Sequence, residues 1–183
     1  MKENNWFDPF YIQSHLNEEE SNIQKNVRDF CNNELKPTVV ERNRKNEFDK
    51  ELYPKFGSLG VLGQTVKTHG GSGTSNLAYG LVAYEFEKID SSYRSSISVQ
   101  SSLVIHPINE FGSQEQKDKY LPPLIKGEKI GCFGLTESEA GSDPTSMKTS
   151  FKKTKDGYII NGSKNWITTV SYTHLTLPTS SRV

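Results

Sequence analysis

The stretch Gly131–Thr149, which reads GCFGLTESEAGSDPTSMKT, decides how this 183-residue chain is interpreted. It opens with a short apolar run, Cys132–Leu135, of the length typical of a buried strand. Small residues and hydroxyls follow, so a ligand could approach the backbone closely and receive hydrogen bonds. The stretch therefore predicts a polar ligand-binding loop, although an ordinary hydroxyl-rich connector has the same composition.

A second stretch, Gly162–Thr169, reads GSKNWITT and places an indole next to hydroxyl groups. A flat heteroaromatic ring with polar edges is a ligand that would need both stretches, because one supplies hydrogen-bond donors and the other an aromatic surface. The residues alone also allow a plainer interpretation, in which Trp166 packs in a core and Thr168 lies on a strand surface.

Helical periodicity dominates the chain up to Gly127. Side chains that can cap helices stand before three of the expected helices, at Asn17, at Ser75 or Asn76, and at Ser113. The helices are expected after Asn17, from about Asp49, after Ser75, over Ser91–Ile105 and over Gln114–Leu121. Pro107 and Pro122–Pro123 are expected to interrupt them, because proline removes a backbone donor.

After Gly127 the pattern changes to short runs rich in Thr, Ile, Tyr and Phe. Strands are expected at Ile130–Leu135, Thr149–Thr154, Tyr158–Asn161 and Asn165–Thr169, with tight turns at Lys155–Gly157 and Asn161–Gly162. Helices followed by antiparallel strands predict an α+β fold rather than βαβ units. The predicted division is a helical domain at 1–127, the start of a β-domain at 128–169 and a separate tail at 170–183.

Composition argues against several classes of function. The 22 basic residues balance 22 acidic ones, so no nucleic-acid partner is expected. The chain lacks an apolar run long enough to span a membrane and an apolar N-terminal signal segment, so a cytoplasmic location is expected. Cys31 and Cys132 are predicted to be free thiols, and no Cys/His spacing suits a metal. His69–Thr74 is rich in glycine but lacks the Gly-Lys-Ser/Thr ending of a phosphate loop, which favours a flexible turn.

The Gly131–Thr149 stretch resembles the flavin-binding signature of the acyl-CoA dehydrogenase family. Two upstream runs, Ser91–Ser95 (SSYRS) and Val99–Leu103 (VQSSL), make the chain most similar to the glutaryl-CoA dehydrogenases of that family. The resemblance extends from about Phe7 to Thr168. It implies FAD as cofactor, an acyl-CoA substrate, and roles for residues in binding each of them.

For the flavin, the resemblance assigns ring contacts to Phe133, Leu135 and Thr136, a packing surface to Trp166, and a hydroxyl near flavin N5 to Thr168. Ser142 would contact the flavin pyrophosphate or the CoA thioester chain. Two neighbours complete the expected cofactor site, Gly141 and Ile167. Ser138 departs from the family, which has proline directly after Thr-Glu, and this leaves the loop less constrained.

For the substrate, the resemblance assigns the distal carboxylate of glutaryl-CoA to Arg94, with Ser95 beside it. A guanidinium is a planar fork of donors that suits a carboxylate. Spacing alone allows another interpretation, in which Arg94 is a surface residue paired with Asp90 or Glu87.

The resemblance also implies what this chain is not expected to contain. The family's catalytic base is a Glu in a C-terminal helical domain, so no catalytic residue is assigned here, and the chain alone is expected to be inactive. The complete enzyme would form a homotetramer, convert glutaryl-CoA to crotonyl-CoA in lysine and tryptophan degradation, and pass electrons to electron-transfer flavoprotein. The tail at 170–183 matches nothing expected. Its alternatives are a divergent strand and a junction, frameshift or assembly artefact; the artefact is favoured, and the tail is excluded from fold reasoning. A dehydrogenase for another short acyl-CoA and a non-enzymatic helical interaction module remain as alternatives.

Overall fold

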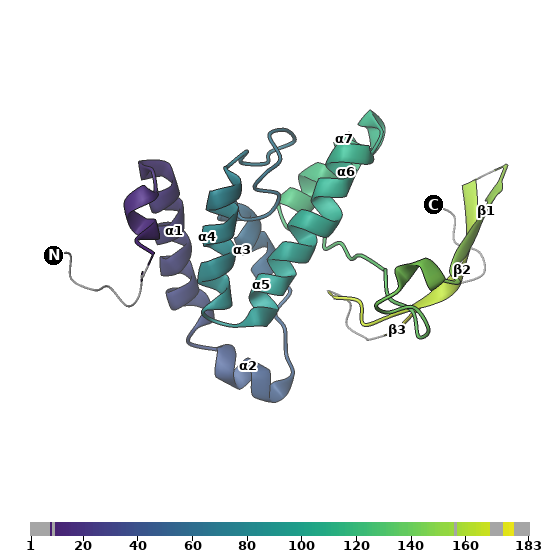
Figure 1. Cartoon of the computed structure of the whole chain (residues 1–183), viewed down its shortest axis with the longest axis horizontal. Coiled ribbons are helices and arrows are strands. Elements are labelled where there is room, and N and C mark those ends of the chain that lie inside the picture. Colours follow the sequence, from purple (N-terminus) through teal and green to yellow (C-terminus); the bar gives the residue numbers. More distant parts are fainter. Residues whose placement is uncertain (1–7, 9, 156, 169–173, 178–183) are drawn as a thin grey trace. The chain divides into compact units, whose positions relative to one another are not determined.

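The computed structural model describes residues 8, 10–155, 157–168 and 174–177. The chain divides into two compact units, Met1–Lys129 and Ile130–Val183, and each is described by itself (Figure 1). Helices make up the first unit and antiparallel strands the second, which confirms the predicted α+β class.

The first unit consists of helices, and the longest connection between them, residues 59–75, joins α3 to α4. The α-helices are α1 (Glu18–Phe30), α2 (Val39–Lys45), α3 (Leu52–Ser58), α4 (Asn76–Glu87), α5 (Ser91–Ser98), α6 (His106–Phe111) and α7 (Gln114–Ile125). A 3-10 turn covers Ile12–His15, and π-helical segments cover Cys31–Leu35 and Val99–Ile105. Asn17 and Ser113 form capping boxes and Ser75 caps α4, so the predicted helix starts are confirmed.

Prolines interrupt the helices less than expected. Pro107 lies in the first turn of α6, directly after the π-helical segment that joins α5 to α6, so the interruption expected at Pro107 is wrong. A wider turn tolerates the missing backbone donor of proline. Pro122 and Pro123 lie inside α7, whose last two turns bury Leu121 and Leu124 in the core. Packing of that apolar face offsets the lost hydrogen bonds.

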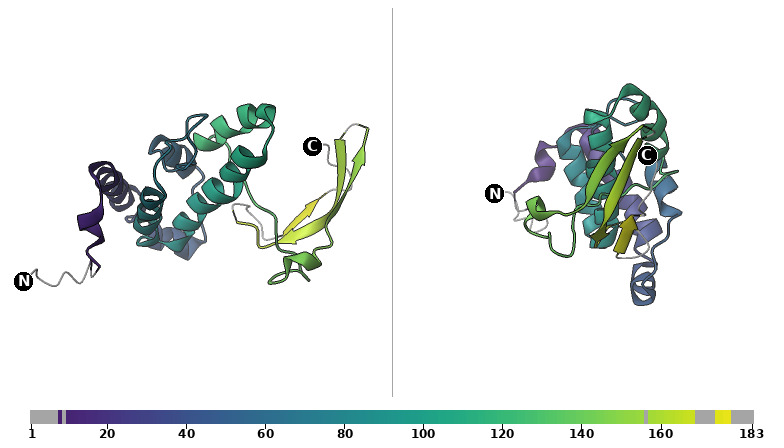
Figure 2. Two further views of the ribbon diagram at one scale, coloured as in Figure 1. Left: turned by 45° about the horizontal axis from the view of Figure 1, so that its top comes forward. Right: turned by 90° about the vertical axis from the view of Figure 1, so that its right-hand side faces the viewer.

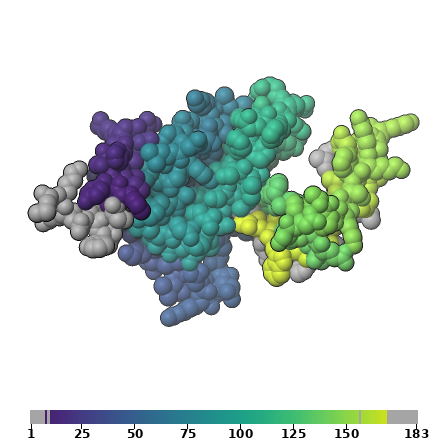
Figure 3. Space-filling view, viewed as in Figure 1, coloured from purple at the N-terminus to yellow at the C-terminus, as the bar shows by residue number. Residues whose placement is uncertain are grey.

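The core of the helical unit is aromatic and aliphatic, and its segments pack into a continuous body (Figure 3). Phe56 and Phe86 are fully buried and meet edge to face, with ring centroids 5.3 Å apart. Helical spacing predicts Leu77, Leu81 and Tyr84 on the inner stripe of α4. Leu81 is buried as predicted, but Leu77 and Tyr84 are exposed. The helix instead buries a neighbouring stripe that includes Glu85, whose carboxylate accepts hydrogen bonds from Gln24 and Arg28 of α1.

The second unit is a three-stranded antiparallel sheet in the order β1-β2-β3 (Figure 2). Its strands are β1 (Ser150–Thr154), β2 (Gly157–Asn165) and β3 (His174–Leu177). Thr154 pairs with Gly157, as expected for a hairpin whose loop is Lys155 and Asp156, although Asp156 is outside the described residues. β3 lies in the stretch that the sequence sets apart as a tail, and residues 169–173 and 178–183 around it are not described.

Three predictions for the β unit are wrong. The strand expected at Asn165–Thr169 does not form, because β2 ends at Asn165 and residues 166–168 are outside any strand. Asn161 and Gly162 form no turn but lie inside one continuous β2, where Gly162 is extended. Glycine is needed there for space, because an added Cβ would lie 2.1 Å from Thr149 Oγ1. The run 130–135 is not a strand. Its apolar side chains Phe133 and Leu135 stay 43% and 38% exposed, so it lacks the burial that a core strand requires.

Candidate functional site

The segment Gly131–Thr149 is a folded loop held against the end of β2. The backbone N–H of Asn165 donates to the carbonyl of Thr136 at 2.9 Å, and the Asn165 side chain donates to Ser138 Oγ at 2.8 Å. Ser138, which stands where the resembling family has proline, therefore ties the loop to β2 through its hydroxyl. The two stretches that the sequence singles out are adjacent in space.

A buried ion pair anchors this loop. Lys164 of β2 donates from Nζ to Glu137 Oε1 at 2.8 Å and to the carbonyl of Leu135 at 2.9 Å. The side chains of Lys164 and Glu137 are only 8% and 9% exposed. Glu137 also accepts the backbone N–H groups of Lys148 at 2.7 Å and Thr149 at 3.0 Å. One carboxylate thus joins the beginning of the loop, its end and the strand.

These donors control the charge of Glu137. Lys164, followed by Thr149 and the Lys148 backbone N–H, lowers the pKa of the Glu137 carboxyl from 4.5 to about 2. Glu137 is therefore ionised at neutral pH with its oxygens already occupied. A carboxylate in this state supports structure and is unsuited to abstracting a substrate proton. This agrees with assigning no catalytic residue to the loop.

The remainder of the loop contains two of the predicted cofactor residues, Gly141 and Ser142. Asp143 caps the 3-10 turn Pro144–Ser146 by accepting the Thr145 backbone N–H at 3.0 Å. Gly141 and Ser142, just before that turn, are exposed. They therefore lie at the surface of the unit, where a ligand could reach them.

The three residues after β2 point in different directions. Trp166 has a left-handed backbone, with φ of 59°, and its side chain is 73% exposed. The alternative of a core tryptophan is therefore wrong. Ile167 is buried and Thr168 is exposed, so the isoleucine packs inside the unit while the indole and the hydroxyl face outward. Of the three predicted contacts, Trp166 and Thr168 are exposed enough to meet a ligand.

Arg94 and Ser95 belong to α5 of the helical unit. Arg94 Nε lies 2.6 Å from Glu87 Oε2, and its side chain is 38% exposed. The surface ion pair that the spacing allows is thus present, with Glu87 rather than Asp90, which instead caps α5. The Ser91 hydroxyl and then Arg94 lower the pKa of Glu87, so the pair is charged at neutral pH.

Sequence reasoning missed Lys164 and the structural role of Glu137. The two residues are separated by 27 positions, and no local pattern links them. Lys164 stands between Ser163 and Asn165, so no apolar neighbours marked it as a buried lysine in need of a partner. Among the described residues, no group of three or more metal-binding side chains is clustered, and no helix is long and apolar enough to cross a membrane.

Comparison with known proteins identifies the class. Sequence models of the acyl-CoA dehydrogenase N-terminal domain and middle domain match residues 17–128 and 132–181. The chain belongs to the acyl-CoA dehydrogenase family. The family match favours the enzyme class over a helical interaction module, and it extends into the stretch that the sequence sets apart as a tail.

Individual relatives differ in their substrates. A glutaryl-CoA dehydrogenase from Mycobacterium smegmatis, solved in complex with FADH2, is 42% identical with a TM-score of 0.84, over 86% of this chain and 41% of that one. The short-chain specific acyl-CoA dehydrogenase of Clostridium acetobutylicum is 40% identical over 84% of this chain and 41% of its own length. The mitochondrial isovaleryl-CoA dehydrogenase of Bos taurus is also 40% identical, over 84% of this chain and 37% of its own length. The chain therefore spans about two fifths of these relatives.

Proposed function

We propose that this chain forms the helical and first β part of an FAD-dependent acyl-CoA dehydrogenase. The observation that carries the proposal is the match to two successive domains of that family, in the same order as in the family. The activity belongs to the complete protein that contains this chain. That protein would bind an acyl-CoA, pass electrons to electron-transfer flavoprotein and assemble as a homotetramer.

The β unit fits a flavin. Trp166 is exposed directly after β2, and the loop tied to that strand exposes the apolar side chains Phe133 and Leu135. Large exposed apolar side chains on an ordered segment are typical of a binding surface. Thr136 and Thr168 add hydroxyl donors that could bind polar ring edges. Bound FAD would supply the hydride acceptor, while these residues would hold and orient its ring.

Within this class we propose glutaryl-CoA as the substrate, with Arg94 as the residue that selects it. Glu87 engages Arg94 through Nε, and within the described residues no hydrogen bond is formed by the two terminal nitrogens. These nitrogens could bind a carboxylate in the bidentate manner typical of arginine. Ser95 beside it and Ser142 on the loop would bind other parts of the substrate. A plain acyl chain offers the guanidinium no partner.

A second candidate is a dehydrogenase for a short monocarboxylic acyl-CoA. It is favoured by the Arg94–Glu87 ion pair, which already satisfies the charge of the arginine without a substrate carboxylate. Relatives at 40% identity include enzymes named for short-chain and isovaleryl substrates.

The two candidates are separated by Arg94→Gln in the complete protein. If glutaryl-CoA is the substrate, kcat/KM for glutaryl-CoA falls about 100-fold or more, because a site built for a charged group discriminates strongly, whereas kcat/KM for butyryl-CoA changes little. Arg44→Gln, an exposed arginine of α2, is the matched control. An unchanged preference would support the second candidate.

For the 183-residue chain alone we expect weak or no FAD binding and no turnover, and robust oxidation of glutaryl-CoA by it would contradict this expectation.

A further inference from the structure

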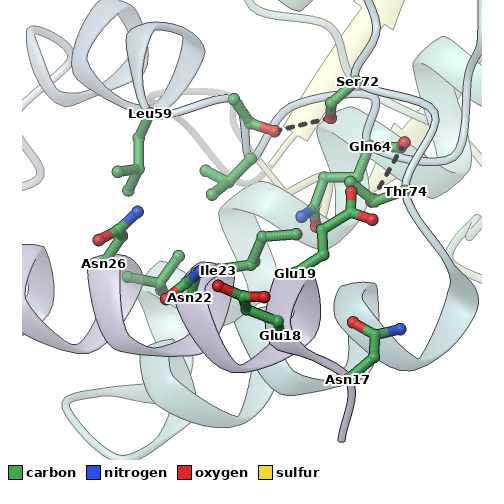
Figure 4. Close-up of a pocket in the computed structure, with 13 residues that line it drawn as sticks. Asn17, Glu18, Glu19, Asn22, Ile23, Asn26, Leu59, Gln64, Ser72 and Thr74 are labelled. Atoms are coloured by element: carbon green, nitrogen blue, oxygen red, sulfur yellow. Dashed lines mark hydrogen bonds between the residues drawn. The ribbon is translucent and has the colours of Figure 1, made fainter.

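A pocket of about 820 Å³ lies in the helical unit, and none of the residues assigned to flavin or substrate lines it. Figure 4 shows side chains of α1 facing those of the connection between α3 and α4 across this space. Its volume is within the range of small-molecule sites. The floor is partly apolar, with Ile23 and Val27 from α1 and Leu59 and Val61 from the connection.

The ionisable groups of the pocket are all acidic. Glu18 and Glu19 line it from the first turn of α1, and no lysine, arginine or histidine does. Neither glutamate forms an ion pair within the part of the chain that the structure describes. First-turn glutamates also stabilise a helix through its dipole, so these two residues alone would not indicate a ligand.

Gln64 supplies the independent observation. Gln64 lines the pocket and is only 2% exposed as a whole residue. Its side-chain Oε1 accepts no hydrogen bond from any described residue. In Figure 4 the Gln64 side chain extends from the connection toward Glu19. The neighbouring hydroxyls do not satisfy it, because Ser72 donates to the Gly60 carbonyl and Thr74 to the Gln64 carbonyl. A buried acceptor without a donor is costly and rare in folded proteins.

We propose that this pocket binds a short aliphatic cation that carries a primary amine or a guanidine. Carboxylates and an amide oxygen accept hydrogen bonds and cannot donate them, so the complementary ligand is rich in donors and positively charged. The methylene stem of the ligand packs on Ile23, Leu59 and Val61, and rotation of the buried Gln64 side chain into the pocket brings its Oε1 to one donor of the ligand. The lining residues include none that are assigned to flavin or substrate, so the proposal does not depend on the proposed function.

The test is calorimetric titration of the 183-residue chain with agmatine and putrescine, with n-butylurea as the uncharged comparison. We expect saturable binding of the cations, at least tenfold weaker binding of n-butylurea, and weakening of cation binding as salt is added. Glu18→Gln combined with Glu19→Gln should weaken cation binding at least tenfold. Glu115→Gln, which removes a first-turn glutamate from α7 outside the pocket, is the matched control and should leave it unchanged.

Gln64→Leu provides the second arm. It removes the unsatisfied oxygen, so the variant should melt at the same or a higher temperature than the original chain while losing cation binding. If Gln64→Leu does not fold, the variant that combines Glu18→Gln with Glu19→Gln still tests whether the pocket binds the cations. The proposal is overturned if neither cation binds saturably, if n-butylurea binds as well as agmatine, or if cation affinity survives the loss of Gln64 or of both carboxylates.

Discussion

Gly162→Ala is predicted to disrupt the candidate flavin loop through a steric clash inside β2. The new Cβ would lie 2.1 Å from Thr149 Oγ1, 2.6 Å from its Cβ and 2.8 Å from its Cα. Ordinary van der Waals contacts of a Cβ begin at 3.4 Å, so all three atoms of Thr149 lie well inside the permitted distance and must move away. Rotation of the side chain cannot relieve the clash, because the Cα of Thr149 is also too close.

The movement of Thr149 has a defined consequence. Its backbone N–H donates to Glu137 Oε1 at 3.0 Å, and a displacement of the backbone away from Glu137 would break that hydrogen bond. Overpacking of a close-fitting site typically destabilises by about 1–3 kcal/mol, and we expect the upper half of this range because backbone atoms are involved. A cost of this size is a large fraction of the stability of a small unit.

The assay is urea denaturation followed by the fluorescence of Trp166, in a Trp6→Phe background that leaves it as the remaining tryptophan of the sequence. Gly141→Ala is the control within the same unit, since its Cβ would have no atom within 4 Å, and its effect should stay within about 0.5 kcal/mol. Equal midpoints for the Gly162 and Gly141 variants would refute the steric argument.

Three further outcomes are expected. Phe56→Ala should cost about 3–5 kcal/mol of unfolding free energy, because the ring is fully buried, whereas Phe111→Ala, whose side chain is 87% exposed, should be near neutral in urea denaturation followed by the helical far-ultraviolet circular dichroism signal. The pKa of Glu137 is lowered to about 2, so its contribution to stability is present above pH 4.5 and is lost as pH falls toward 2; acid titration by near-ultraviolet circular dichroism should show this loss, and Glu137→Gln should remove that pH dependence. Burial raises the pKa of the Cys31 thiol to about 12, so a thiol reagent at pH 8 should modify exposed Cys132 and leave Cys31 unmodified until the chain unfolds.

Local signals explain what could be predicted from the sequence. The start of α1 follows from Asn17 and Glu20, because a capping box is formed by residues three positions apart. The β1–β2 hairpin follows from the residues around Gly157 for the same reason. These features depend on residues that are neighbours in the sequence, so local sequence patterns predict them.

Other features depend on partners far along the chain. The run 130–135 has the composition of a buried strand, but burial is decided by which segments cover it, and composition does not specify them. Gly162 illustrates a second ambiguity, since glycine serves both in turns and where backbones approach closely. Only the position of Thr149, which comes from the other side of the β1–β2 hairpin, distinguishes the two roles.

The same distinction applies within the candidate site. Trp166 was recognisable from the sequence as a candidate aromatic contact, whereas its exposure and the residues that support it were not. Lys164 and Glu137 are buried beneath the loop and fix both ends of it to the strand that leads to the indole. A binding surface requires such support, because a loop that must order itself on binding loses affinity to entropy. The residues that would touch a flavin are therefore held in place by residues that need not touch it.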